Sequence, residues 1–262
     1  MTGHARARDG KQAIEMTREQ RLARAFVRLA DTLAPGFDPL RLFDELVSQC
    51  IALLDADAGG VLVADARGGM RIMAASPEDA AGLELLQLLT GEGPCVDCYR
   101  VGAPLTVADL DAERDRWPDL AGAAPALGYR STCTVPLRLH SSTIGALNLF
   151  RREAGPIPPA DAGLAQALAD SAALSLLHWS ADPAGDGEVL IKTQAAIAYR
   201  NALEIAKGMI AHHAHVPVAA ATDLLRRYAA ARGASLVAIV RALVDRTLAP
   251  SDVVARAETP ET

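Results

Sequence analysis

The distribution of strand signals constrains this chain more than any other feature, because all of them precede a break at residues 183–187 that contains Pro and Gly. Before the break, helical apolar repeats alternate with short β-type runs and Gly-Gly turns. After it, the pattern is helical throughout. A chain of 262 residues is long enough for two hydrophobic cores. We therefore expect an α+β domain over 17–180, a linker over 181–187 and an all-α domain over 188–249.

The two ends of the chain carry little structural signal. Residues 1–16 are polar and basic with no apolar segment behind them, which predicts a disordered leader rather than a secretory signal. We interpret residues 250–262 as a tail. No run approaches the roughly 18 apolar residues of a membrane-spanning helix, so we expect a cytoplasmic protein without a membrane partner. Four cysteines in 262 residues do not form a disulfide framework.

The first domain is predicted to be a sheet flanked by helices. Two hairpins are indicated, one pairing 61–63 with 70–73 across Gly68-Gly69 and one pairing 133–139 with 144–150. Gly145 in the second hairpin is expected to let a neighbouring backbone approach closely. A further short strand is expected over 104–107 and helices over 17–33, 39–54, 78–89 and 161–178.

The second domain begins with a long helix, expected over 188–213, that carries a strip of small apolar residues. Their spacing alternates between four and three, the heptad pattern of helices that pack side by side. Such a strip packs either inside its own domain or against a second copy of the chain in a coiled coil. Two shorter helices are expected over 217–232, ended by Gly233, and over 236–248, capped by Ser235. The strip consists of Ile191, Ala195, Ala198, Ala202, Ile205 and Met209.

Charge is divided unevenly between the domains. The whole chain has a net charge of -6, yet residues 188–249 contain eight Lys or Arg against four Asp or Glu. A basic domain on an acidic body favours an anionic partner for that domain, although a solvated basic face has the same composition.

The segment from Ala198 to Ile210, with Ala-Lys-Gly at 206–208, resembles the signature of the ANTAR family of RNA-binding antiterminators. Residues 224–229 are similar to the family's second-helix pattern, and Ile239, Leu243 and Val244 to the apolar side of its third helix. Thr222 stands where an aromatic residue is usual, and His212-His213 replace a usual Glu and Arg. The resemblance implies a dimer that binds paired RNA hairpins.

Basic side chains supply the expected RNA contacts. Arg200 and Lys207 are seven residues apart and therefore share one helix face, which we expect to point outward. Gly208 is costly in a helix, which indicates close approach by another backbone or a nucleotide. Arg226 and Arg227 can contact phosphates and Tyr228 can stack on a base. The predicted RNA-binding residues are Arg200, Ala206, Lys207, Gly208, Arg226, Arg227 and Tyr228. No metal is expected, since the adjacent His212 and His213 diverge on a helix.

Residues 91–100, 128–131, 135–137 and 144–149 resemble the GAF domains that are commonly joined to ANTAR domains in actinobacteria. The resemblance implies an antiparallel sheet with a pocket on one face for a small-molecule ligand. It indicates no known cofactor, and the signature of cyclic-nucleotide-binding members is missing. Cys95 and Cys98 form a CxxC, which is a redox or sensor pair, half of a metal site, or two small residues packed at a helix start.

These patterns predict an RNA-binding transcription regulator, an antiterminator under the control of a GAF sensor, and not an enzyme. One alternative is a DNA-binding regulator, because three basic helices can also form a helix-turn-helix. Another is a thiol-dependent GAF-fold reductase of free methionine sulfoxide that uses Cys95, Cys98 and Cys133.

Overall fold

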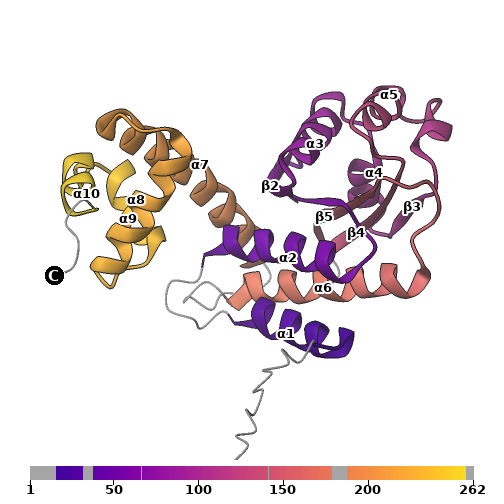
Figure 1. The fold of residues 1–262 in the computed structure, drawn as a ribbon, viewed down its shortest axis with the longest axis horizontal. Helices are drawn as coiled ribbons and strands as arrows, with labels where there is room; N and C mark the ends of the chain where they lie inside the picture. Colours follow the sequence, from indigo (N-terminus) through magenta and orange to yellow (C-terminus); the bar gives the residue numbers. More distant parts are fainter. Residues whose placement is uncertain (1–15, 32–37, 66, 141, 179–187, 258–262) are drawn as a thin grey trace, which may run out of the picture.

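The computed structural model describes residues 16–31, 38–65, 67–140, 142–178 and 188–257. They form two lobes joined by one long helix (Figure 1). The first lobe is a sheet between two layers of helices, and the second is helical throughout its described residues. The described residues before 179 carry all five strands and those after 187 carry helices only, while the expected leader (except Met16) and linker lie outside the described residues.

The described strands form one antiparallel sheet of five, in the order β2-β1-β5-β4-β3. Both expected hairpins are confirmed, β1 with β2 and β4 with β5. The two hairpins meet where β1 pairs with β5. At this contact, a Cβ atom on Gly145 would lie 2.1 Å from the carbonyl oxygen of Leu62. The close approach predicted at Gly145 is thus confirmed. The strands are β1 (Ala58–Ala64), β2 (Met70–Ser76), β3 (Leu105–Val107), β4 (Ser131–Leu139) and β5 (Ser142–Arg151).

Helices cover both faces of the sheet. One face packs against α2 (Pro39–Leu53) and α6 (Pro159–His178), with α1 (Arg18–Ala30) outside them. The other face packs against α3 (Glu78–Thr90) and α4 (Pro94–Val101), with α5 (Pro118–Ala126) beyond. The short helix η1 (Leu110–Glu113) and α5 were not expected from the sequence.

The second lobe contains α7 (Glu188–Ala214), α8 (Val218–Ala231), α9 (Leu236–Val244) and α10 (Pro250–Ala257). The expected helix signals at its turns are confirmed: Gly233 has a φ of +59°, and the Ser235 hydroxyl accepts the amide hydrogen of Ala238. Helix α9 ends four residues before its expected end at Leu248. The expected tail contains α10, whose Val253 is fully buried against α7 and α8.

Helix α7 connects the lobes. It contacts α2, α6 and the β1, β2 and β5 strands of the first lobe, and it packs against α8, α9 and α10 of the second. In the described ranges, every helix is too short or too polar to traverse a lipid bilayer.

Candidate functional site

The strip of small apolar residues on α7 is only partly covered by the lobe that α7 helps to build. Ala198 is exposed and 53% of Ile205 is exposed, while Ala195, Ala202 and Met209 are half-buried. The opposite face of α7 supplies core residues of its own lobe, and Ala202 of the strip also packs against that core, so packing inside the domain accounts for only part of the strip. The side chain of Ile191 lies outside the described residues.

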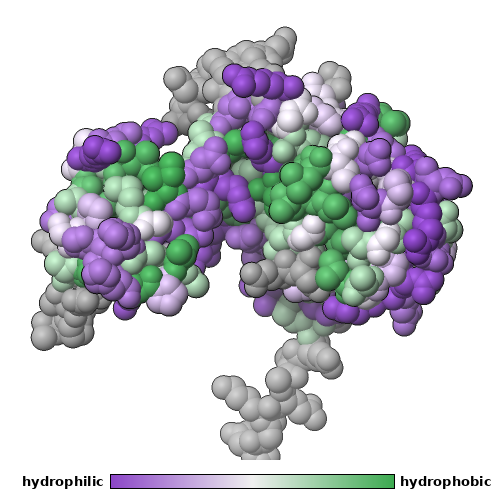
Figure 2. All heavy atoms as spheres, turned by 90° about the horizontal axis from the view of Figure 1, so that it is seen from above, coloured by the Kyte–Doolittle hydropathy of each residue, from purple (hydrophilic) through white to green (hydrophobic). Residues whose placement is uncertain are grey.

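A shallow groove of about 210 Å³ continues this strip from α7 onto α9. Ala198 and Ala202 form one wall, and Val237 and Val244 form the other. Figure 2 shows hydrophobic surface on both lobes and hydrophilic residues between them. An apolar groove of this kind suits an apolar helix surface rather than a polyanion.

The residues predicted to bind RNA do not form one outward face. Arg200 is half-buried, and its Nη1 donates a hydrogen bond to the backbone carbonyl of Met73 on β2 at 2.6 Å. The side chain of Lys207 is only 19% exposed, and its Nζ lies 2.9 Å from the Glu204 carboxylate. The expectation that Arg200 and Lys207 both point outward is therefore corrected for Arg200, because α7 runs along the sheet at that position.

Two of the predicted contacts belong to the core. Ala206 is fully buried, and Tyr228 is 2% exposed beneath the guanidinium of Arg232, which lies 5.3 Å from the ring centroid. Neither can meet a nucleotide, so the expected base stacking on Tyr228 is corrected. Gly208 is exposed, and no described atom outside its own helix would lie within 4 Å of a Cβ there.

Arg226 and Arg227 are exposed on α8, as expected. The Nη1 of Arg226 lies 3.7 Å from the Asp223 carboxylate, an exposed pair that solvent screens strongly. These two arginines form the exposed basic surface that the prediction retains, whereas Lys207 is half-buried and paired with Glu204.

The CxxC cysteines lie in α4 and are buried. Both thiols pack against Leu62 of β1 and Ala146 of β5. Burial raises the pKa of the Cys98 thiol to about 12 and holds the pKa of Cys95 well above its usual value. Thiol chemistry requires the thiolate, so the structure favours the interpretation of two small packed residues.

The same face of the sheet holds a buried polar cluster that the sequence did not predict. Glu84 of α3 is 0% exposed, and its carboxylate accepts hydrogen bonds from Nδ2 of Asn148 at 2.6 and 2.8 Å and from Nε2 of Gln87 at 3.0 Å. Thr134 donates to Oδ1 of Asn148 at 2.7 Å. Gly60 of β1 leaves room for this carboxylate, since a Cβ there would lie 2.3 Å from Oε1 of Glu84.

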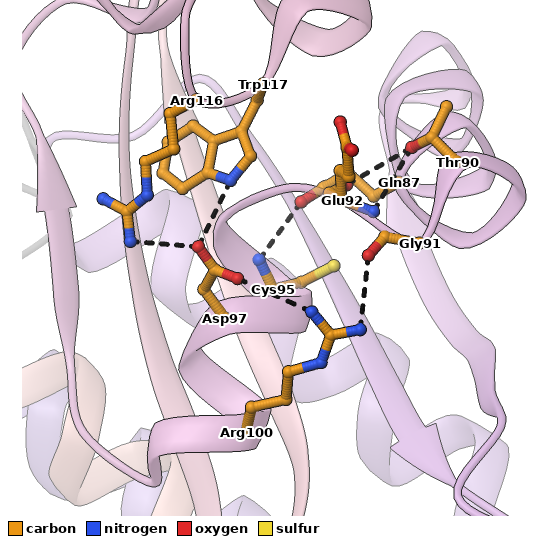
Figure 3. Close-up of polar contacts among 9 residues, drawn as sticks. All are labelled: Gln87, Thr90, Gly91, Glu92, Cys95, Asp97, Arg100, Arg116 and Trp117. Atoms are coloured by element: carbon orange, nitrogen blue, oxygen red, sulfur yellow. Dashed lines mark hydrogen bonds and ion pairs between the residues drawn. The ribbon is translucent and has the colours of Figure 1, made fainter.

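Gln87 extends this cluster to the start of α4. Its Oε1 accepts the amide hydrogen of Cys95 at 3.1 Å (Figure 3). Two residues further along α4, Asp97 accepts hydrogen bonds from Arg116 at 2.9 Å and from the Trp117 indole at 3.2 Å. Helices α3, α4 and the start of α5 are therefore joined through polar contacts over the sheet.

Burial raises the pKa of Glu84 to about 8, although the hydrogen bond from Asn148 opposes the shift. Both protonation states are thus accessible near neutral pH.

Comparison with known proteins bears on this first lobe. A family model described as GAF domain matches residues 38–176, just over half of the chain. The chain belongs to the GAF domain family. No curated protein matches its sequence.

Solved structures similar to the GAF domain come from several bacteria. The GAF domain of an Acinetobacter phosphoenolpyruvate-protein phosphotransferase is 15% identical with a TM-score of 0.49, covering 70% of this chain and 97% of that one. A Geobacter sulfurreducens GAF domain/HD domain protein is 19% identical with a TM-score of 0.46, covering 59% and 97%. The free methionine-R-sulfoxide reductase from Neisseria meningitidis, in complex with its substrate, is 16% identical with a TM-score of 0.44, covering 69% and 90%.

The GAF domain meets α7 through polar contacts at the first turn of α2. The hydroxyl of Tyr199 donates a hydrogen bond to Oδ2 of Asp38 at 3.2 Å, and both residues are 5% exposed. Asp38 also caps α2 by accepting the amide hydrogen of Leu40 at 2.9 Å. Burial raises the pKa of Asp38, while the bonds from Leu40 and Tyr199 oppose that rise.

Proposed function

We propose that this protein is an RNA-binding transcription regulator in which the GAF domain receives a signal and the C-terminal lobe binds hairpin RNA as a homodimer. The proposal places the protein in the cytoplasm, with transcripts as its partners. The residues that resemble the ANTAR signature lie on α7, and the following basic helix is α8. No catalytic step is proposed, because the buried thiols with raised pKa supply no thiolate nucleophile.

The observation that carries the proposal is the exposed part of the apolar strip on α7. Exposed Ile205 and Ala198 cost solvation in a monomer, whereas a second copy of the same helix would bury both. Small side chains such as Ala198 and Ala202 allow two helices to approach closely. A dimer formed in this way would present two basic surfaces, which matches the two hairpins of a tandem-hairpin RNA.

The RNA-binding surface is tested with the full chain and a tandem-hairpin RNA. The double substitution Lys207→Ala/Arg227→Ala is expected to weaken binding at least tenfold and to reduce the slope of log affinity against log salt, because it removes phosphate contacts. Fluorescence anisotropy over a range of salt concentrations measures both quantities.

The matched control is Arg24→Ala/Arg67→Ala, which removes the same charge from two exposed positions of the first lobe. Wild-type affinity in Lys207→Ala/Arg227→Ala, or an equal loss in the control, would contradict the proposed site. Stronger binding to duplex DNA than to hairpin RNA would instead favour the DNA-binding alternative.

A further inference from the structure

One residue assigned to RNA binding is already engaged by the GAF domain. The guanidinium of Arg200 donates to the Met73 carbonyl at 2.6 Å, a contact between residues 127 positions apart in the chain. A carbonyl oxygen and a phosphate oxygen accept hydrogen bonds from the same donor groups. RNA that binds this guanidinium must therefore displace or reorient the contact to β2.

The neighbouring residue fixes α7 in this position. Tyr199 donates to Asp38 at 3.2 Å in a nearly solvent-free environment, and Asp38 in turn caps α2. A hydrogen bond to a buried carboxylate is stronger than one between neutral groups. Tyr199 therefore holds α7 against the GAF domain one residue away from Arg200.

The negative charge of Asp44 also opposes RNA binding by the basic side chains near α7. Asp44 lies on the exposed side of α2, and the positive charges of Arg200 and Arg226 both act on its carboxylate. A carboxylate at this position attracts the side chains that would bind phosphates and repels the phosphates themselves.

We infer that the GAF domain, when docked on α7 through these contacts, opposes RNA binding, and that a signal which releases α7 increases RNA affinity. The inference rests on the proposed function and states the direction in which the GAF domain changes RNA affinity. Since coupling between two binding events is reciprocal, bound RNA must also weaken the docking of the GAF domain on α7.

Two substitutions in the full chain test this inference without touching the RNA surface. Tyr199→Phe removes the hydroxyl but keeps the packed ring, and Asp44→Asn removes the exposed charge. Each is expected to bind a tandem-hairpin RNA about fivefold more tightly than the wild type at fixed salt, the change that loss of one competing hydrogen bond or charge produces. The control Asp115→Asn removes an equivalent exposed charge far from α7 in sequence and should keep wild-type affinity.

Hydrogen exchange of the wild-type protein provides a second measurement. Saturating RNA is expected to speed exchange of the amides in the first turn of α2, where Asp38 caps the helix. If Tyr199→Phe fails to fold, Asp44→Asn and the exchange measurement decide the question.

Wild-type or weaker RNA affinity in the junction variants, an equal gain in Asp115→Asn, or unchanged exchange on adding RNA would each overturn the inference. Arg227→Ala separates this failure from failure of the proposed function, because Arg227 is exposed on α8 and is not one of the two residues, Tyr199 and Arg200, whose hydrogen bonds hold α7 against the GAF domain. Lost binding in Arg227→Ala without a gain in the junction variants overturns only the regulation. Wild-type binding in Arg227→Ala overturns the RNA surface itself.

Discussion

At the scale of single residues, Glu84 is a carboxyl group whose described partners are amides and not cations. Burying a carboxylate without a cation is costly, so the group is stabilised as the neutral acid and its pKa rises to about 8 from 4.5. Between these two values the folded protein holds more protons than the unfolded chain. The contribution of Glu84 to stability is therefore complete below about pH 4.5 and is lost as pH rises through about 8.

The variant Glu84→Gln is expected to remove this dependence. Relative to the wild type, its free energy of unfolding should increase as pH rises from about 5 to about 8, by at most about 1.4 kcal/mol per pH unit, because only the wild type loses stability over this range. Urea denaturation at several pH values measures the difference, with Glu92→Gln as a control at a more exposed position. A difference that is constant with pH would show that Glu84 is ionised in the folded protein.

The residue scale also shows what local sequence can predict. Gly233, Ser235 and Gly145 were predicted because their roles depend on backbone conformation or on the adjacent strand. The burial of Glu84 was not predicted, because a Glu in a helix has the same local pattern whether or not a distant residue such as Gly60 leaves room for its carboxylate. One signal was available for Glu84, since it lies on the same helix face as the buried Ala80, Leu83 and Gln87.

At the scale of elements, the hairpins and long helices were predictable because their periodicity extends over many residues. Helix α5 was not, since Gly122 and Pro125 interrupt its pattern. Helix α10 was missed because eight residues carry too short a repeat, although Val253 packs fully into the lobe. Its burial requires α7 and α8, which supply the surface that the short helix alone lacks.

The contribution of α10 is measurable. Val253→Ala should destabilise the C-terminal lobe by about 2 kcal/mol, because it leaves a small cavity at a fully buried position. Urea unfolding, monitored through hydrogen exchange of the amides in α7 and α8, measures the loss of stability. Ser251→Ala, on the exposed side of α10, serves as the control. Equal stability of Val253→Ala and the wild type would mean that α10 does not belong to the folded lobe.

At the scale of the whole molecule, the change from a sheet-containing lobe to a helical lobe was predictable, because strand patterns occur only before the break at residues 183–187. The docking of the GAF domain on α7 was not predictable from the sequence, because the pattern of α7 is that of one continuous helix and its partners Met73 and Asp38 are remote in sequence. The exposed part of the strip on the same helix gives the molecule its proposed assembly, with two copies joined along α7 and two basic surfaces for RNA.

The most direct test of this account is the mass of the full-length protein in solution, alone and with a tandem-hairpin RNA. We predict a dimer for the wild type that binds one such RNA. Ile205→Glu should give a monomer with at least tenfold weaker RNA binding, whereas Val218→Glu, at a position exposed to a similar extent on α8, should remain a dimer. A wild-type monomer, or an Ile205→Glu protein that dimerises and binds RNA as the wild type does, would contradict the account.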